Sequence, residues 1–244
     1  MIKSLIFDFG GTIDTDGIHW IEKFWDSYQQ HSINVSRAQF IDAYIFAERK
    51  MNEKINMKDS FRTTITQQLS LQFEYLQNNN IYKNNNSGAD IASECYADVE
   101  NSISKFKKII EKLENQYTLA VVSNFYGNLE TVLDEFNIKN FFKLIIDSTV
   151  VKIRKPDPEI FRTTLKRLST LPEQSFVIGD SYENDIKPAH EIGCGTIWLI
   201  NKNYQRKENT FFADYKISSI NQLRSILKSK RVLQQNNFLS KGNY

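Results

Sequence analysis

Cysteine is scarce in this chain, which contains only Cys95 and Cys194. The two residues lie far apart, and neither has a second thiol or a histidine at the spacing of metal ligands. This pattern excludes a disulfide framework and gives no indication of a zinc site. Free thiols persist in reducing compartments, so we expect a cytoplasmic protein.

The sequence also lacks a surplus of charge. Its 31 basic and 29 acidic residues give a formal net charge of +2, without the basic excess that drives non-specific nucleic-acid binding. No apolar run reaches the ~18 residues of a membrane span. The opening stretch "MIKSLIFDFGG" lacks the length and the cleavage pattern of a secretory signal. We therefore expect a soluble protein with neither nucleic acid nor membrane as a partner.

What the chain does contain is a series of short apolar runs, each ending in Asp, Asn or Ser. These runs are residues 4–8, 118–124, 143–148, 175–180 and 196–201. Continuous apolar runs of this length are typical of strands that are covered on both faces, and helical patterns separate most of them. The sequence therefore predicts an α/β fold with a doubly wound parallel-sheet (Rossmann-like) core.

One long interruption breaks this alternation between the first and second runs, where no convincing strand occurs. Stretches with helical apolar spacing fill it, and Ser36 is the expected N-cap of one of them. These stretches are residues 19–31, 36–51, 60–77 and 89–113. We expect them to form an α-helical cap inserted into the core.

The interruption divides the chain into three parts. Residues 1–15 together with 115–230 are predicted to form the Rossmann-like core, and residues 16–114 the helical cap. Residues 231–244, "RVLQQNNFLSKGNY", are polar near the end and are predicted to be a C-terminal tail.

Reactive residue types follow the predicted strands. Asp8 ends the first run, Ser123 and Asn124 the second, and Asp180 the fourth, while Lys155 precedes a predicted helix. Ligands of a doubly wound sheet bind at the carboxyl ends of its strands, so we expect these side chains to converge. A carboxylate nucleophile, a hydroxyl, an ammonium and further carboxylates are the groups needed to bind a phosphate monoester with Mg²⁺.

Four motifs carry a specific resemblance. "DFGGTID", "VVSN", "KPDPEIF" and "GDSYENDI" occur in this order, each at a predicted strand or helix boundary. In these motifs the chain resembles the haloacid dehalogenase (HAD) superfamily of aspartate-nucleophile phosphohydrolases and their relatives, with a helical cap after the first strand. The resemblance covers the core from residue 1 to about residue 227, whereas the cap resembles the family only in position and helical character.

The resemblance implies catalytic and phosphate-binding roles. Asp8 would attack phosphorus and form an aspartyl-phosphate, and Lys155 would neutralise charge on the nucleophile and the transferring group. The phosphate-binding set implied by the motifs is Gly11, Thr12, Ser123, Asn124 and Lys155. The expected ligand is a small phosphorylated metabolite.

The resemblance also implies a Mg²⁺ site. Mg²⁺ binds few carboxylates and retains several waters, so Asp8, Asp180 and the backbone carbonyl of Gly10 form a sensible set of ligands. Asp185 would act beside them, through water or by holding Lys155.

Gly10 departs from the family pattern. Phosphatases of this family usually carry a second aspartate two residues after the nucleophile, which protonates the leaving oxygen and later deprotonates the attacking water. The metal contact survives this change because any residue supplies a backbone carbonyl. The proton-transfer group does not survive it, although Asp14 and His19 are nearby in the sequence and are possible replacements.

Three functional interpretations follow from these residues. The first is a Mg²⁺-dependent hydrolase of small phosphate monoesters, slowed by Gly10. The second is a binding or regulatory protein on the same fold, which holds a phosphorylated ligand but turns it over weakly or never. The third is phosphonate cleavage through a cap lysine, for which Lys50, Lys54 and Lys58 are available. A metal-free dehalogenase fits poorly because the acidic "GDSYEND" cluster indicates a cation site.

Overall fold

The computed structural model describes residues 1–83, 87–201, 203 and 212–229, so the predicted tail at 231–244 lies outside the described residues. Six parallel strands form one sheet in the order β3-β2-β1-β4-β5-β6. Their bounds are Ser4–Phe7 (β1), Thr118–Ser123 (β2), Leu144–Asp147 (β3), Ser175–Gly179 (β4), Gly195–Leu199 (β5) and Tyr215–Ile217 (β6). The five predicted strands are present, and β6 was missed.

β1 occupies the middle of the sheet. Its Leu5 pairs with Leu119 of β2 on one side and with Phe176 of β4 on the other. Because these three neighbouring strands are parallel, their carboxyl ends reach the same edge of the sheet. The residues that directly follow β1 and β4, Asp8 and Asp180, therefore lie at one edge.

Both faces of the sheet are covered, as the continuous apolar runs predicted. Leu5 and Phe7 belong to one hydrophobic cluster, together with buried residues of α4 (Ser87–Ile110) and α5 (Leu129–Glu135). Ile6 points to the other face because side chains alternate along a strand. There it clusters with residues of α7 (Glu159–Leu168) and α8 (Lys187–Glu191).

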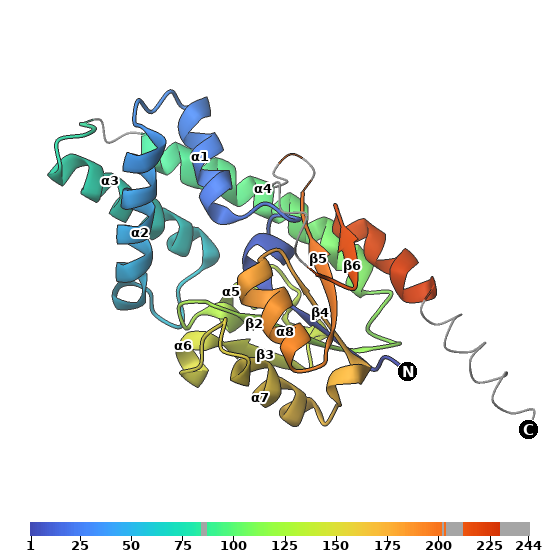
Figure 1. The fold of residues 1–244 in the computed structure, drawn as a ribbon. Helices are drawn as coiled ribbons and strands as arrows, with labels where there is room; N and C mark the ends of the chain where they lie inside the picture. Colours follow the sequence, from blue (N-terminus) through green and yellow to red (C-terminus); the bar gives the residue numbers. More distant parts are fainter. Residues whose placement is uncertain (84–86, 202, 204–211, 230–244) are drawn as a thin grey trace, which may run out of the picture.

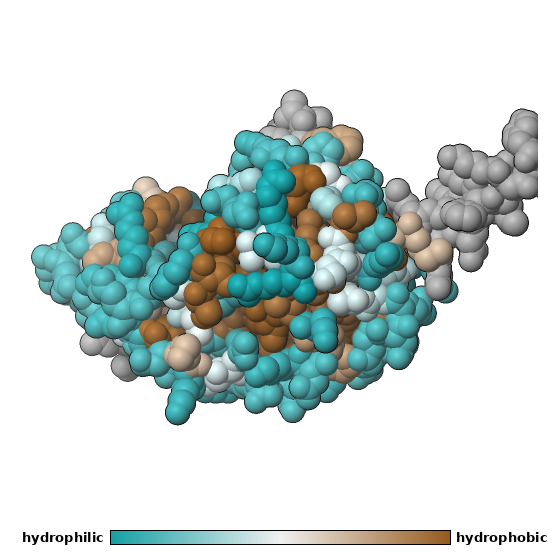
Figure 2. Space-filling view, turned by 90° about the horizontal axis from the view of Figure 1, so that it is seen from below, coloured by the Kyte–Doolittle hydropathy of each residue, from teal (hydrophilic) through white to brown (hydrophobic). Residues whose placement is uncertain are grey.

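The core also contains the helices α6, α7 and α8. Their bounds are Ser148–Val151 (α6), Glu159–Leu168 (α7) and Lys187–Glu191 (α8). Figure 2 shows the molecule from below, where hydrophobic surface gathers in the middle of the face and hydrophilic residues surround it. No helix among the described residues has both the length and the hydropathy needed to cross a bilayer.

The cap is helical, as predicted, and is inserted between β1 and β2. Its first helices are α1 (Trp20–Gln30), α2 (Arg37–Lys54) and α3 (Phe61–Asn78), which lie beside the sheet in Figure 1. Ser36 caps α2 as expected, since its Oγ accepts from the N–H of Gln39 at 3.2 Å. The Gln39 side chain returns a bond to the Ser36 N–H at 2.8 Å, completing a capping box.

A carboxylate at the end of α5 joins the core to the cap. Glu135 Oε2 accepts from the N–H of Phe61, the first residue of α3, at 2.6 Å. Its Oε1 accepts from the Tyr96 hydroxyl of α4 at 2.8 Å. A negative charge at a helix N-terminus is favourable, so Glu135 stabilises α3 and fixes its position on the core.

Replacing Glu135 with Ala is expected to lower the free energy of unfolding by about 1–3 kcal/mol, because two partly buried donors lose their acceptor. Chemical denaturation measures this change. Glu130→Ala is the matched control, since Glu130 also lies on α5 but makes an exposed ion pair with Lys139 at 3.0 Å. Equal stability of the two variants would contradict the bridging role.

Candidate active site at the carboxyl edge of the sheet

A cavity of about 180 Å³ lies between the carboxyl edge of the sheet and the cap. The core contributes Asp8, Ser123, Lys155 and Asp180 to its lining, and the cap contributes side chains from α1, α2 and α3. Four polar residues that are far apart in the sequence, and that the sequence marked as candidates, therefore meet in one place.

Asp8 follows β1 directly and is 5% exposed. Its Oδ1 accepts two hydrogen bonds, from Ser123 Oγ at 3.1 Å and from Lys155 Nζ at 2.6 Å. Among the described residues, no hydrogen bond reaches the other oxygen, Oδ2. One carboxylate oxygen of Asp8 is thus held in place, and the second remains available to a ligand in the cavity.

Lys155 links two carboxylates at the centre of the site. Its Nζ lies 2.6 Å from Asp8 Oδ1 and 2.6 Å from Asp185 Oδ1, and it also donates to the Val122 carbonyl at 3.2 Å. Burial alone would lower the pKa of Lys155, but the charges of Asp185 and Asp8 outweigh it and raise the pKa above its usual range. The ammonium therefore stays charged at neutral pH.

Asn124 fixes the backbone of Lys155. The Asn124 amide donates to the Lys155 carbonyl at 3.0 Å, and its Oδ1 accepts from the Lys155 N–H at 2.9 Å. Asn124 lines the cavity, but both ends of its amide are occupied by these bonds. The geometry supports a positioning role for Asn124, and direct contact with phosphate stays a prediction.

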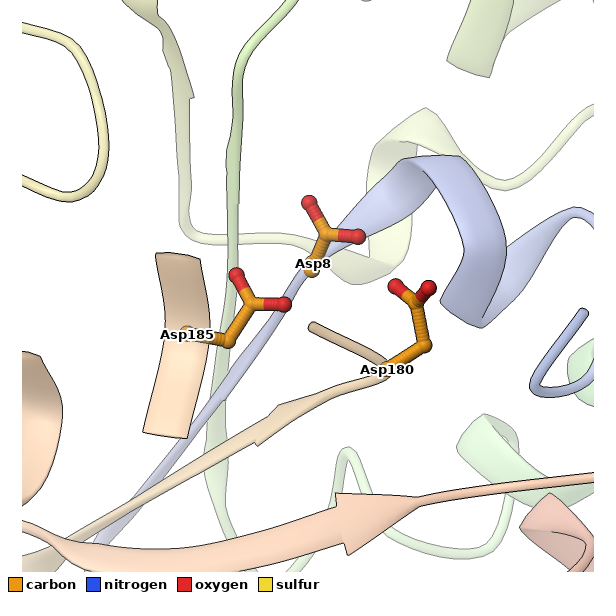
Figure 3. A group of neighbouring side chains, drawn as sticks. All are labelled: Asp8, Asp180 and Asp185. Carbon is orange, nitrogen blue, oxygen red and sulfur yellow. The ribbon is translucent and has the colours of Figure 1, made fainter. Parts of the chain in front are cut away.

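Three carboxylates gather beside this ammonium: Asp8, Asp180 and Asp185 offer oxygen atoms within 4.8 Å of one another, and Figure 3 shows them pointing toward a common space. Burial, followed by the charges of Asp8 and Asp185, raises the pKa of Asp180 well above its usual value. Burial also raises the pKa of Asp185 to about 6, against the opposing charge of Lys155. Like charges in a buried site raise each other's pKa unless a cation is present.

These residues fit a divalent cation. One ammonium cannot balance three carboxylates, so two negative charges would remain if all three were ionised. Carboxylate oxygens are the ligands that Mg²⁺ prefers. Asp8, Asp180 and Asp185 are therefore the side chains that would hold the ion, and Gly10 lines the cavity beside Asp8.

Two glycines are required for this arrangement and a third is not. A Cβ on Gly11 would lie 2.4 Å from the Asp180 carboxyl, and one on Gly179 would lie 2.4 Å from the Asp185 carboxyl. Gly11 also has a φ of 92°, which favours glycine. Gly10 has a φ of −76° and a ψ of 116°, and a Cβ there would meet Trp20 at an ordinary distance of 3.7 Å. The backbone thus gives no reason for glycine at position 10.

Asp14 occupies a site that the sequence did not reveal. It is 1% exposed, and its oxygens accept from the Gly11 N–H and from Trp20 Nε1, both at 2.7 Å. Burial raises the pKa of Asp14 to about 7, although these two bonds oppose the shift. Asp14 does not line the cavity, so it holds the turn and the Trp20 ring. His19, by contrast, does line the cavity.

Phosphate binding by Gly11 and Thr12 stays a prediction, and their present hydrogen bonds bear on it. The Gly11 N–H donates to Asp14, so it is not free to bind phosphate in this arrangement. Thr12 is 1% exposed and its Oγ1 donates to Asp180 Oδ1 at 3.3 Å. Neither residue lines the cavity, and both support the turn that follows Asp8.

The cap lysines lie away from the site. Lys50 contacts Glu74 at 3.7 Å on the cap surface, and none of Lys50, Lys54 and Lys58 lines the cavity. Phosphonate cleavage through a cap amine therefore has no support from their placement.

Trp20 and Phe24 are four residues apart and pack together within the cap, with ring centroids 4.9 Å apart. Both side chains also line the cavity.

Comparison with known families agrees with this geometry. The family model described as haloacid dehalogenase-like hydrolase matches residues 5–199 of this chain. The chain belongs to this family. The matched region contains β2 to β5, nearly all of β1 and the inserted helices, so the HAD resemblance inferred from the four motifs is confirmed.

Individual relatives match over shorter stretches. Glyceraldehyde 3-phosphate phosphatase of Methanocaldococcus jannaschii is 34% identical over 97 residues, which is 40% of this chain and 42% of that protein. Pyrimidine 5'-nucleotidase YjjG of Escherichia coli is 25% identical over 122 residues, 49% of this chain and 53% of that protein. These matches span about half the length of the curated relatives or less.

A solved structure matches nearly the whole chain. YfnB from Bacillus subtilis, a HAD-hydrolase bound to magnesium, superposes with a TM-score of 0.56 and 21% identity. The match covers 93% of this chain and 98% of YfnB. At this identity the similarity shows that the two proteins share a fold.

Mg²⁺ is expected to raise the thermal unfolding temperature of the protein, because an ion that binds only the folded state stabilises it by about 2.7 kcal/mol at 100 times its Kd. Asp180→Asn should remove most of this shift. Asp98→Asn is the matched control, since Asp98 is an exposed acid on α4 that pairs with Lys23. An equal Mg²⁺ shift in both variants, measured by differential scanning fluorimetry, would contradict the proposed ligand set.

Proposed function

We propose that this chain is a Mg²⁺-dependent phosphatase that hydrolyses small phosphate monoesters through an aspartyl-phosphate on Asp8. The observation that carries the proposal is the asymmetric environment of the Asp8 carboxylate. Lys155 and Ser123 hold Oδ1, while Oδ2 has no protein partner among the described hydrogen bonds. An oriented carboxylate with one open oxygen, beside a buried ammonium and two further carboxylates, suits nucleophilic attack on phosphorus.

The first step forms a bond between Asp8 Oδ2 and phosphorus. The bond between phosphorus and the ester oxygen breaks, and its electron pair stays on that oxygen, which leaves as an alkoxide or phenolate and takes a proton from solvent. Lys155 stabilises the negative charge on the transferring group, and the Ser123 hydroxyl can turn from Asp8 toward a phosphoryl oxygen. Water then attacks the phosphorus of the aspartyl-phosphate, which releases inorganic phosphate and restores the Asp8 carboxylate.

Asp8, Asp180 and Asp185 would hold the Mg²⁺ ion. When bound, the ion would neutralise charge on the phosphoryl oxygens and help to orient them. Asp185 also fixes Lys155, because its Oδ1 accepts from Nζ and its Oδ2 accepts from the Ser181 N–H at 3.1 Å. The metal ligands and the catalytic ammonium are therefore positioned by one shared network.

Gly10 limits the rate on difficult substrates. A positioned general acid is typically worth about 10² to 10⁴ in rate, and Gly10 offers no group for this role. An acidic leaving group departs without protonation, so esters that carry one should be the better substrates. His19 lines the cavity and is the remaining candidate for proton transfer.

The relatives support a small phosphorylated substrate. One of them is named for the dephosphorylation of glyceraldehyde 3-phosphate, and another for that of pyrimidine nucleotides. Both names describe the dephosphorylation of small phosphate monoesters, which is the class of substrate proposed here.

We place the enzyme in the cytoplasm, because Cys95 and Cys194 are both free and buried.

Asp8→Asn is expected to abolish Mg²⁺-dependent release of phosphate from an activated aryl phosphate such as 4-nitrophenyl phosphate. The neutral amide cannot act as the nucleophile and also loses its charge beside Lys155. Acid quench of the wild-type reaction should trap a phosphoenzyme that the variant lacks. Absence of both release and phosphoenzyme in the wild-type protein, with Mg²⁺ still bound, would favour a binding protein on this fold.

Gly10→Asp is expected to raise kcat for an alkyl phosphate, such as glycerol phosphate, by tenfold or more, with a smaller gain for 4-nitrophenyl phosphate. The Cβ fits at 3.7 Å from Trp20, and the carboxyl group supplies the missing acid. Gly10→Asn is the matched control because it has the same shape but cannot transfer a proton. Equal rates for the two variants would show that proton transfer at position 10 is not what limits turnover.

A further inference from the structure

The cap half of the cavity has an aromatic wall. Side chains from α1, α2, α3 and the loop after β2 form it, and most of them are buried or half-buried. They are Trp20, Phe24, Tyr44, Phe61, Phe125 and Tyr126. Such a wall favours a flat apolar group, which it can contact edge-to-face or by offset stacking.

A carboxylate lies among these rings. Glu48 Oε1 accepts from the Tyr126 hydroxyl at 2.8 Å and from Gln68 Nε2 at 2.9 Å. Burial raises the pKa of Glu48, while these bonds and the charge of Arg154 oppose the shift. Glu48 is not part of the cluster around Asp8, so the cap contributes a separate polar site to the same cavity.

Gln68 provides an unsatisfied acceptor at this site. The residue is 4% exposed and lines the cavity, and its Oε1 has no hydrogen-bond partner among the described residues. The Nε2 bond to Glu48 fixes the orientation of the amide, which leaves Oε1 for another donor. Buried polar atoms are normally paired, so an orphan acceptor in a cavity indicates a ligand with an N–H or O–H group.

The size of the cavity limits what this ligand can be. A cavity of about 150 Å³ is enough to hold one benzene ring. The cavity measures about 180 Å³ in total, and the phosphoryl group must lie at the core end beside Asp8. A phosphoryl group and one ring together occupy all of this space, so a larger group, such as a base with its ribose, would extend through the open side of the cavity into solvent.

Building on the phosphatase activity proposed above, we propose that the substrate is a phosphate monoester of a single-ring phenol that carries a hydroxyl or amino group away from the phosphate. The ring lies against the aromatic wall, and its hydroxyl or amino group donates to Gln68 Oε1, whose orientation the Glu48 carboxylate fixes. Such an ester also suits Gly10, because a phenolate leaves more readily than an alkoxide. Gly10 in the core and the aromatic wall of the cavity are independent features, and both favour a phenolate as the leaving group.

The test compares kcat/KM for 4-aminophenyl, 4-hydroxyphenyl and 4-methylphenyl phosphate. These esters have leaving groups of similar acidity and size, but the last has no donor. We expect the first two to exceed the third by tenfold or more in the wild-type protein. Gln68→Met should reduce this preference to less than threefold, and Glu48→Gln should weaken it in the same direction.

Gln72→Met is the matched control. Gln72 lies on the same helix and is fully buried, but its Oε1 accepts from Tyr28 and it does not line the cavity. The control should keep the wild-type preference. Circular dichroism and thermal unfolding of all variants show whether a lost preference reflects a lost fold.

The outcomes separate this inference from the proposed activity. Turnover of all three esters without a preference, or a better rate for O-phosphoethanolamine, would overturn the ring-and-donor assignment while leaving the phosphatase in place. No turnover of any ester would overturn the phosphatase. In that case calorimetric binding of the 4-amino and 4-methyl esters with Mg²⁺ still decides the inference, since the preference of Gln68 for a donor does not need catalysis.

Discussion

The buried ammonium of Lys155 is the interaction on which the rest of the site depends. A charge removed from water must be paired and hydrogen-bonded, or the folded state is strongly destabilised. Lys155 meets this requirement with Asp8 directly after β1 and Asp185 beside α8, while Asn124 holds its backbone. This pairing holds together three segments that lie far apart in the sequence. It also leaves the acidic cluster with too little positive charge, which explains why the same place suits a cation.

The glycines separate what the fold requires from what the chemistry selects. Gly11 and Gly179 have no room for a side chain, because the carboxyls of Asp180 and Asp185 already occupy the space. Replacing Gly11 would displace the Asp180 carboxyl, and replacing Gly179 would displace the Asp185 carboxyl that pairs with Lys155. Gly10 is under no such constraint, and Trp20, fixed by Asp14, lies beside it at ordinary distance. Packing at position 10 therefore does not explain why this chain has glycine there and no acidic side chain.

The sequence predicted the core better than the cap. Strand ends in a parallel sheet converge by topology, so Asp8, Ser123 and Asp180 could be placed together from strand order alone. Strand β6 was missed because three residues give too short a pattern to recognise. Glu48 and Gln68 were missed for another reason. They lie on helical faces that also carry packing residues, and their role depends on how α2 and α3 approach each other, which no local pattern encodes.

The proposed function gives the division between core and cap a chemical meaning. Under that proposal, the core supplies a nucleophile and charge neutralisation that any phosphate monoester can use. It does not supply the proton that a poor leaving group needs, so reactivity must come from the ester itself. The cap then has to select an ester whose alcohol is acidic, and an aromatic wall achieves this because phenols are flat as well as acidic. Gln68 and Glu48 add a requirement that shape alone cannot impose, since they distinguish rings of equal size by the presence of a donor. In this arrangement the specificity of the cap compensates for the group that the core lacks.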